Sequence, residues 1–208
     1  MRHILTLYKD ILVKKKIIAL SVAFSAALLS SSALAALDGG QVDFAGLVSD
    51  NTCAPHVNGG SQDGQVQLKT AKTADISANT GVSDTTPGVM PERFYITVDC
   101  GAATSNTKAN LSMASTFFSN ANGTLENDKA IISPASGVNL AIHMVDSSGA
   151  AVAYKQVKVN NPTDTHQVAF KSGIATFNFV VSYVRQASAV AVKPGYVKSN
   201  TAYTVSYE

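Results

Sequence analysis

The sequence predicts an antiparallel β-sandwich, and two observations carry this prediction. From Ala36 onward, apolar and polar residues alternate as they do on strands with one buried and one solvated face, and the spacing of an amphipathic helix does not occur. Turn signals such as Asn58-Gly59 and Asn122-Gly123 separate the strand-like runs. Short strands joined by turns, with little helix, are typical of a sandwich.

The alternation predicts individual strands. The segment 69–91, between the predicted strands 65–68 and 93–98, is predicted to be mostly loop with at most one short helical turn. The run 140–145, the loop Ser147-Ser148-Gly149 and the run 151–154 form a predicted hairpin. The other predicted strands are residues 65–68, 93–98, 109–113, 175–183 and the C-terminal run 202–207. Residues 65–68 and 109–113 are the weaker candidates among them.

Residues 1–35 have the features of a secretory signal peptide. Lys14-Lys15-Lys16 precedes the apolar run 17–29, and small residues then lead to a predicted cleavage site between Ala35 and Ala36. The alternative is a membrane anchor, but this run is shorter than the roughly 20 residues that span a bilayer. The stretch before Lys14 is longer than a leader needs, so the true start codon is left open.

The residues after Ala35 carry 11 Lys and Arg against 13 Asp and Glu, a net charge of about −2. This balance argues against a nucleic-acid partner. The sequence also contains no nucleophile elbow and no zinc-binding helix motif, so we expect no enzymatic activity, no metal and no cofactor. We interpret Glu92 and Asp99 as solvated surface carboxylates. We interpret the lone histidines as structural, and the sequence leaves open which face of its strand His143 occupies.

Two cysteines, Cys53 and Cys100, remain in a chain that the leader would direct out of the reducing cytosol. An even number predicts a disulfide bond. Closing a 47-residue span would stabilise the fold by about 4 kcal/mol on the chain-entropy model. The alternatives are two free buried thiols, or a metal site that includes His56.

Both ends of the mature chain read as strands. Near the N-terminus, Val42, Phe44 and Val48 would project to one side of an extended segment, with bare backbone at Gly46 between them. At the C-terminus, Tyr203, Val205 and Tyr207 alternate with small polar residues. The simplest interpretation is that the two ends pair within one sandwich.

These ends also carry a family resemblance. The segment Gly40-Gln41-Val42-x-Phe44-x-Gly46-x-Val48-x-Asp50-x-x-Cys53 resembles the start of pilins assembled by the chaperone–usher route, and is most similar to rod subunits of the type 3 fimbrial kind. At the other end, the penultimate tyrosine and the glycine fourteenth from the terminus in that family are matched by Tyr207 and Gly195.

The resemblance implies an incomplete immunoglobulin-like sandwich that lacks its last strand and is completed by donor-strand exchange. The final strand, about residues 196–207, would border an open groove that a neighbouring subunit fills. The implied domains are a signal peptide (1–35), a donor extension (36–48) and a pilin domain (49–208). The implied donor residues are Val42, Phe44, Gly46 and Val48, and the implied groove edge consists of Gly195, Tyr203, Val205 and Tyr207.

The same resemblance implies a structural subunit of an extracellular fimbrium that supports cell adhesion or biofilm formation. Its partners would be identical or related pilin subunits in a linear polymer, a periplasmic chaperone and an outer-membrane usher. Two alternatives stay open: a minor or adaptor pilus subunit, and a secreted monomeric β-sandwich that binds its ligand through loops.

Overall fold

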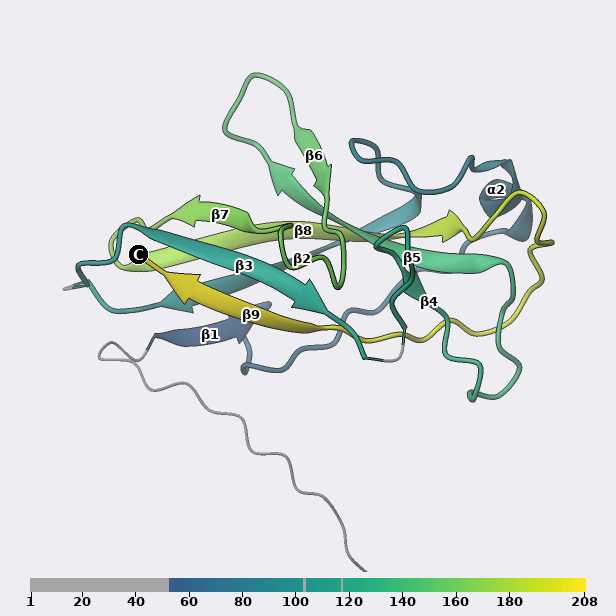
Figure 1. Ribbon diagram of the computed structural model, residues 1–208, viewed down its shortest axis with the longest axis horizontal. Coiled ribbons are helices and arrows are strands. Elements are labelled where there is room, and N and C mark those ends of the chain that lie inside the picture. The colour runs from purple at the N-terminus through teal and green to yellow at the C-terminus, as the bar shows by residue number, and fades with distance from the viewer. Residues whose placement is uncertain (1–52, 103, 117) are drawn as a thin grey trace, which may run out of the picture. The chain divides into compact units, whose positions relative to one another are not determined.

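The computed structural model describes residues 53–102, 104–116 and 118–208 (Figure 1). These residues form nine strands and one short helix. The strands are β1 (Ala54–Val57), β2 (Val89–Asp99), β3 (Lys108–Ala114), β4 (Leu125–Glu126), β5 (Val138–Asp146), β6 (Ala153–Gln156), β7 (His166–Ala169), β8 (Ile174–Arg185) and β9 (Ala202–Tyr207), and the helix is α2 (Thr73–Ala78).

The strands form two sheets, and every strand pair in them is antiparallel. The larger sheet has the order β1-β2-β8-β5-β4, with β6 paired to β5, and the smaller has the order β7-β3-β9. Buried residues of both sheets belong to one hydrophobic cluster, which includes Phe177 and Phe179 from β8 and Leu111 from β3. The predicted all-β sandwich is therefore confirmed.

Most of the predicted strands lie where the alternation indicated. Residues 93–98 fall in β2, residues 109–113 in β3 and residues 175–183 in β8. The predicted hairpin consists of β5 and β6, in which Val145 pairs with Tyr154. Both turn signals are confirmed as well, since Gly59 and Gly123 have φ angles of +73° and +70°, a region that favours glycine.

The predicted strand at residues 65–68 is wrong. Val66 and Leu68 are half-buried, and Gln65 and Gln67 are exposed, so the alternation is present. However, this segment pairs with no strand in either sheet of the described chain. Alternation reports one buried face, whereas a strand also needs a neighbour for its backbone hydrogen bonds. In the following segment, the short helical turn predicted within 69–91 is confirmed as α2.

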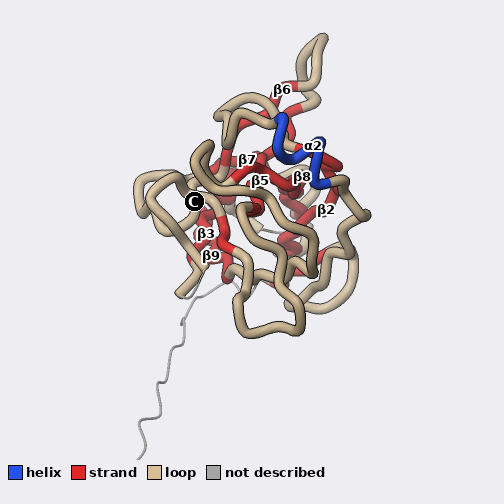
Figure 2. Tube along the Cα trace, turned by 90° about the vertical axis from the view of Figure 1, so that its right-hand side faces the viewer, coloured by secondary structure: helices blue, strands red, loops and turns tan. Residues whose placement is uncertain are grey.

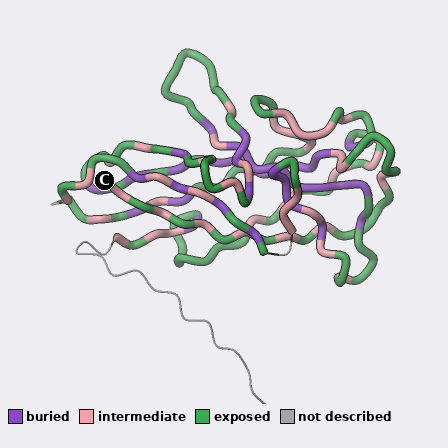
Figure 3. Tube along the Cα trace, viewed as in Figure 1, coloured by how far each residue is buried: buried purple, intermediate pink, exposed green. Residues whose placement is uncertain are grey.

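Both faces of the larger sheet are covered over most of β5 and over residues 179–184 of β8, and Figure 3 shows these strands largely as buried. The inward face packs in the core. The outward face lies beneath the segment 79–88, in which Gly88 donates its N–H to Ser182 Oγ at 2.8 Å. His143 faces outward beneath the same segment and is fully buried, with Nε2–H donating to Ser83 O at 2.7 Å.

The predicted disulfide bond between Cys53 and Cys100 is confirmed. It ties the start of β1 to the end of β2, at the end of the sandwich where Cys100 N donates to Gly173 O at 2.9 Å. We call this the disulfide end. Within the described ranges, no helix is long and apolar enough to cross a membrane.

Candidate functional site

Strand β9 is an edge strand with one bonded side. It pairs with β3 in the register Ala109↔Tyr207, Leu111↔Val205 and Met113↔Tyr203. On its other side, no strand of the described chain accompanies it. An edge of this kind presents a row of backbone N–H and C=O groups to which a further strand can bind.

The inward side chains of β9 are less well covered than those of its neighbour. Ala109, Leu111 and Met113 of β3 are buried, with Leu111 fully inaccessible. Tyr203, Val205 and Tyr207 face the same way from β9 but are only half-buried. The inward residues of β9 are therefore less well covered than those of β3, and Figure 3 shows β9 without buried residues.

A second element of the described chain, the segment 65–71, also lacks a strand neighbour. The segment 65–71 packs Val66, Leu68 and Ala71 against the core, each half-buried. Tyr203 Oη donates to Gln62 O at 2.7 Å, which connects β9 to the chain that follows β1. We call β9 and the segment 65–71 together the open edge, because each has an apolar inner face and lacks a strand neighbour on that side in the described chain.

Burial, and secondarily the negative charge of Asp63, raises the pKa of the Tyr203 phenol. The hydroxyl therefore keeps its proton and acts as donor to Gln62 O throughout the physiological range. This hydrogen bond ties β9 to Gln62, shortly before the segment 65–71.

Three of the four residues predicted for the groove edge lie together on β9, namely Tyr203, Val205 and Tyr207. Gly195 lies apart, before the strand, where a Cβ would collide with the backbone of Ser133 and Ala135. The structure thus accounts for this glycine by close backbone approach. The predicted donor residues Val42, Phe44, Gly46 and Val48 lie outside the described residues.

Sequence reasoning misplaced Glu92. Its side chain is only 19% exposed, and Oε1 lies 2.6 Å from Lys69 Nζ. The available signal was parity, because Glu92 shares the inward side of β2 with Phe94 and Ile96. Burial of the Tyr183 phenol, and secondarily the negative charge of Glu92, raises the pKa of Tyr183. Asp99 is exposed, as expected.

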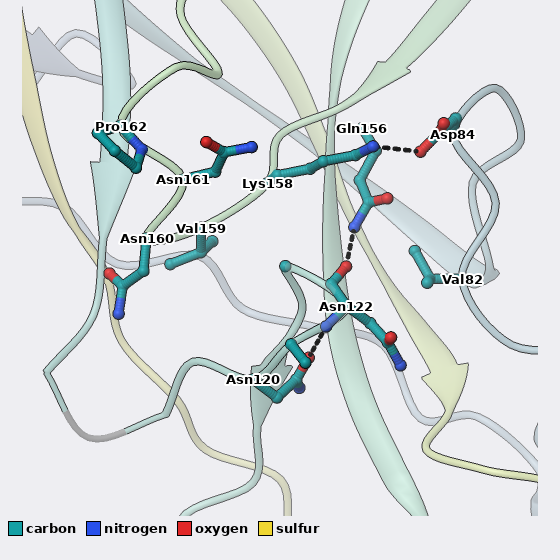
Figure 4. Close-up of a pocket in the computed structure, with 12 residues that line it drawn as sticks. Val82, Asp84, Asn120, Asn122, Gln156, Lys158, Val159, Asn160, Asn161 and Pro162 are labelled. Carbon is teal, nitrogen blue, oxygen red and sulfur yellow. Dashed lines mark hydrogen bonds and ion pairs between the residues drawn. The ribbon is translucent and has the colours of Figure 1, made fainter.

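A surface cavity of about 570 Å³ lies between residues 82–84, 120–123 and 156–162 (Figure 4). Several of its polar groups are already used within the protein: Asn120 Oδ1 accepts from Asn122 N at 3.0 Å, and Gln156 Nε2 donates to Asn122 O at 2.8 Å. Across the described part of the chain, no cluster of His, Cys, Asp and Glu could hold a metal ion. The open edge is therefore the candidate site.

A family model described as fimbrial protein matches residues 42–208. Comparison with curated protein sequences finds no significant match.

Solved structures show the fold. A chaperone–usher pilus structure, whose title concerns the molecular basis of rod uncoiling, has 15% identity and a TM-score of 0.54, covering 83% of this chain and 97% of that chain. The P pilus rod subunit PapA has 14% identity and a TM-score of 0.52, covering 75% of this chain and 99% of its own. Since the fimbrial model spans most of the sequence and the fold agrees, the chain belongs to the fimbrial protein family, whose members are structural pilus subunits and not enzymes.

Proposed function

We propose that this chain polymerises by donor-strand exchange, in which residues 42–48 of one copy add a strand to the open edge of the next. The observation that carries the proposal is the contrast within one sheet: Tyr203, Val205 and Tyr207 are half-buried beside fully covered partners on β3. A strand laid along β9 would complete that cover.

Backbone hydrogen bonding supports the same proposal. Among the described residues, no backbone–backbone hydrogen bond involves residues 65–71, and β9 is bonded on one side only. Backbone donors and acceptors in a folded protein are almost always paired. A strand inserted between these two elements would supply partners to both.

The donor segment has the side chains for this task. Val42, Phe44 and Val48 would each contribute about 1.5–3 kcal/mol on burial, or roughly 5–9 kcal/mol together. Gly46 between them would meet a shallow part of the edge where a Cβ collides. Because donor and acceptor are different surfaces, the contact does not close on itself and propagates as a fibre.

Assembly outside the cytosol follows from the leader-like residues 1–35 and from the disulfide bond, which forms in oxidising compartments. Until the donor strand of a neighbouring subunit covers it, the open edge favours aggregation. A periplasmic chaperone that lends a strand, followed by an outer-membrane usher, would protect it on the way to an extracellular fimbrium. A fimbrium of this kind would support cell adhesion or biofilm formation.

The test uses a matched pair of substitutions in the donor segment. Gly46→Val places a branched side chain on the inward face, and Ala45→Val places the same side chain on the outward face. We expect electron microscopy to show normal fibres from Ala45→Val and none from Gly46→Val, with both chains folded. Normal fibres from both variants would contradict the proposal.

Removal of residues 36–48 tests the acceptor separately. The truncated chain should form no fibres but should bind a synthetic peptide of residues 36–50, with a rise in its unfolding temperature. If the truncated chain is a stable monomer and does not bind the peptide, the result would favour the alternative of a secreted monomeric β-sandwich that binds its ligand through loops.

A further inference from the structure

Two loops at one end of the sandwich are joined into a rigid unit. Residues 131–137 form the second part of the connection from β4 to β5, and residues 193–197 lie shortly before β9. Ala135 N donates to Tyr196 O, and Tyr196 N donates to Ser133 O, each at 2.9 Å. The buried Asn127 side chain adds Nδ2–H bonds to Ala135 O and Tyr196 O, both 2.9 Å long.

This rigid unit exposes two large apolar side chains. Ile132 is 85% exposed and Tyr196 is 70% exposed, the highest values among the large hydrophobic residues of the described chain. Such side chains on an ordered backbone lose little conformational freedom on binding, and tyrosine is enriched at the energetic centres of protein interfaces. We call residues 131–137 and 193–197 the apolar platform.

The apolar platform lies at the end of the sandwich opposite the disulfide end. Near the platform, Val138 pairs with Arg185, and Gln186 N donates to Gly137 O at 3.0 Å. At the disulfide end, Asp99 pairs with Ile174, and Lys108 N donates to Glu208 O at 3.0 Å. Strand β9 runs from the platform toward the disulfide end (Figure 1), and Figure 2 looks onto the end that carries the loops and α2.

The direction of an added strand decides what meets the platform. Both sheets are antiparallel throughout, so a donor strand that continues the pattern runs opposite to β9. Val42 would then lie toward Tyr207, and Val48 would lie toward Ala202, at the end that carries the platform.

The donor copy cannot lie far away. Cys53 follows Val48 by five positions in the sequence, and an extended chain over five steps reaches at most about 18 Å. Cys53 is fixed at the disulfide end of its own domain by its bond to Cys100. The disulfide end of the donor copy must therefore sit close to the platform of the acceptor copy.

We propose that the apolar platform is a second interface between consecutive copies and packs against the disulfide end of the copy that donates the strand. That end offers its own exposed apolar side chain, Ile174, which is 42% exposed at the start of β8. The inference rests on the proposed strand donation. It adds that the joint between copies is a packed contact, so the subunits are held in a defined orientation.

Cysteine cross-linking in intact fibres tests the contact. The two natural cysteines are bonded to each other, so introduced cysteines supply the only free thiols. Fibres of the full chain carrying Tyr196→Cys and Ile174→Cys are treated with a short bismaleimide, denatured and separated by size. We expect a ladder of covalent multimers, because each copy is linked to both neighbours.

The matched control pairs Ile174→Cys with Val152→Cys in place of Tyr196→Cys. Val152 is 47% exposed and lies in the turn between β5 and β6, away from either end. This control should give no ladder. Equal multimer yields from the test pair and the control would overturn the platform assignment. Cross-linked dimers from Ile174→Cys alone would also overturn it, because they would show two disulfide ends meeting, as in a parallel strand addition.

A double substitution, Ile132→Ser with Tyr196→Ser, gives an independent measurement. Both side chains are exposed, so the domain should fold, and fibres should form but break several-fold faster under shear. Unchanged breakage would contradict the inference while leaving strand donation intact. If the unsubstituted chain formed no fibres, the proposed function itself would be wrong.

Discussion

Strands β8 and β9 show the same alternation in the sequence but have opposite surroundings in the fold. β8 is bonded on both sides, to β2 and β5; its inward face is buried along the strand, and residues 179–184 are buried on both faces. β9 is bonded on one side, to β3, and its inward residues are half-buried. The comparison teaches that alternation defines a face, whereas the number of neighbours decides whether the strand stabilises the domain or remains available for a partner.

The two strands should accordingly respond differently to substitution. Changes in β8 should lower the stability of the domain, and changes in β9 should weaken assembly more than folding. The following predictions test this division, beginning with the largest expected effect.

Phe177→Ala should lower the free energy of unfolding by about 3–5 kcal/mol, because it leaves a cavity in the core. Phe177 is fully buried, and its ring stacks with that of Phe179 at a distance of 6.3 Å between ring centroids. Chemical denaturation of the donor-deleted chain with bound peptide measures the change. Thr176→Ala, on the exposed face of β8, is the control, and equal losses for both variants would remove the distinction.

Val205→Ser should mainly weaken strand binding. Val205 is half-buried in the single chain and would become fully buried beneath a donor strand. The remaining burial of about 0.75–1.5 kcal/mol that the variant loses corresponds to roughly a fourfold to tenfold lower affinity for the donor peptide. Isothermal titration measures it, with Thr204→Ala on the outward face as control. An unchanged affinity would show that this face of β9 is not the acceptor.

Tyr203→Phe removes the hydroxyl that bonds to Gln62 O and keeps the ring. The expected loss is about 0.5–1.5 kcal/mol of stability, since an exposed carbonyl regains water. Thermal unfolding of the donor-deleted chain measures it. A loss as large as that of Phe177→Ala would mean that the open edge carries as much stability as the core.

His143 gives the covered face of β5 a dependence on pH. Burial lowers the pKa of His143 below its ordinary value of 6.5, opposed by its hydrogen bond to Ser83 and by the charge of Asp84. The unfolded chain then takes up the proton more readily, so this contribution to stability is present above pH 6.5 and is lost as the pH falls below it.

Thermal unfolding of the chain and of His143→Gln at pH 7.5 and at pH 5.5 tests this dependence. The difference between the two pH values should be smaller in the variant than in the unsubstituted chain. Equal differences would show that protonation of His143 does not couple to folding.

Prediction from sequence succeeded where the signal was local. β2, β3, β8 and the β5–β6 hairpin follow from alternation, and the disulfide bond follows from two cysteines in a chain with a leader-like N-terminal segment. It failed where the outcome depends on distant chain segments. The segment 65–71 has the correct alternation but no strand neighbour in the described chain, and the half-buried Glu92 pairs with Lys69 from another segment.

The C-terminal strand shows both outcomes. The alternation of Tyr203, Val205 and Tyr207 placed them on one face, and the structure agrees. The strand itself begins at Ala202, later than residue 196, because Tyr196 instead bridges to Pro134 in a loop contact. Gly195 belongs to that contact, which no periodicity in the sequence could reveal.

The sequence alone determined the β class, the face of each main strand, the cysteine pair and a family likeness at both ends, because each depends on residue type and short-range spacing. Only the tertiary structure decided which strand lacks a neighbour, which face His143 occupies and which side chains stand at the end opposite the disulfide. Those features arise from contacts between segments distant in the chain, and such contacts leave no periodic trace in the sequence.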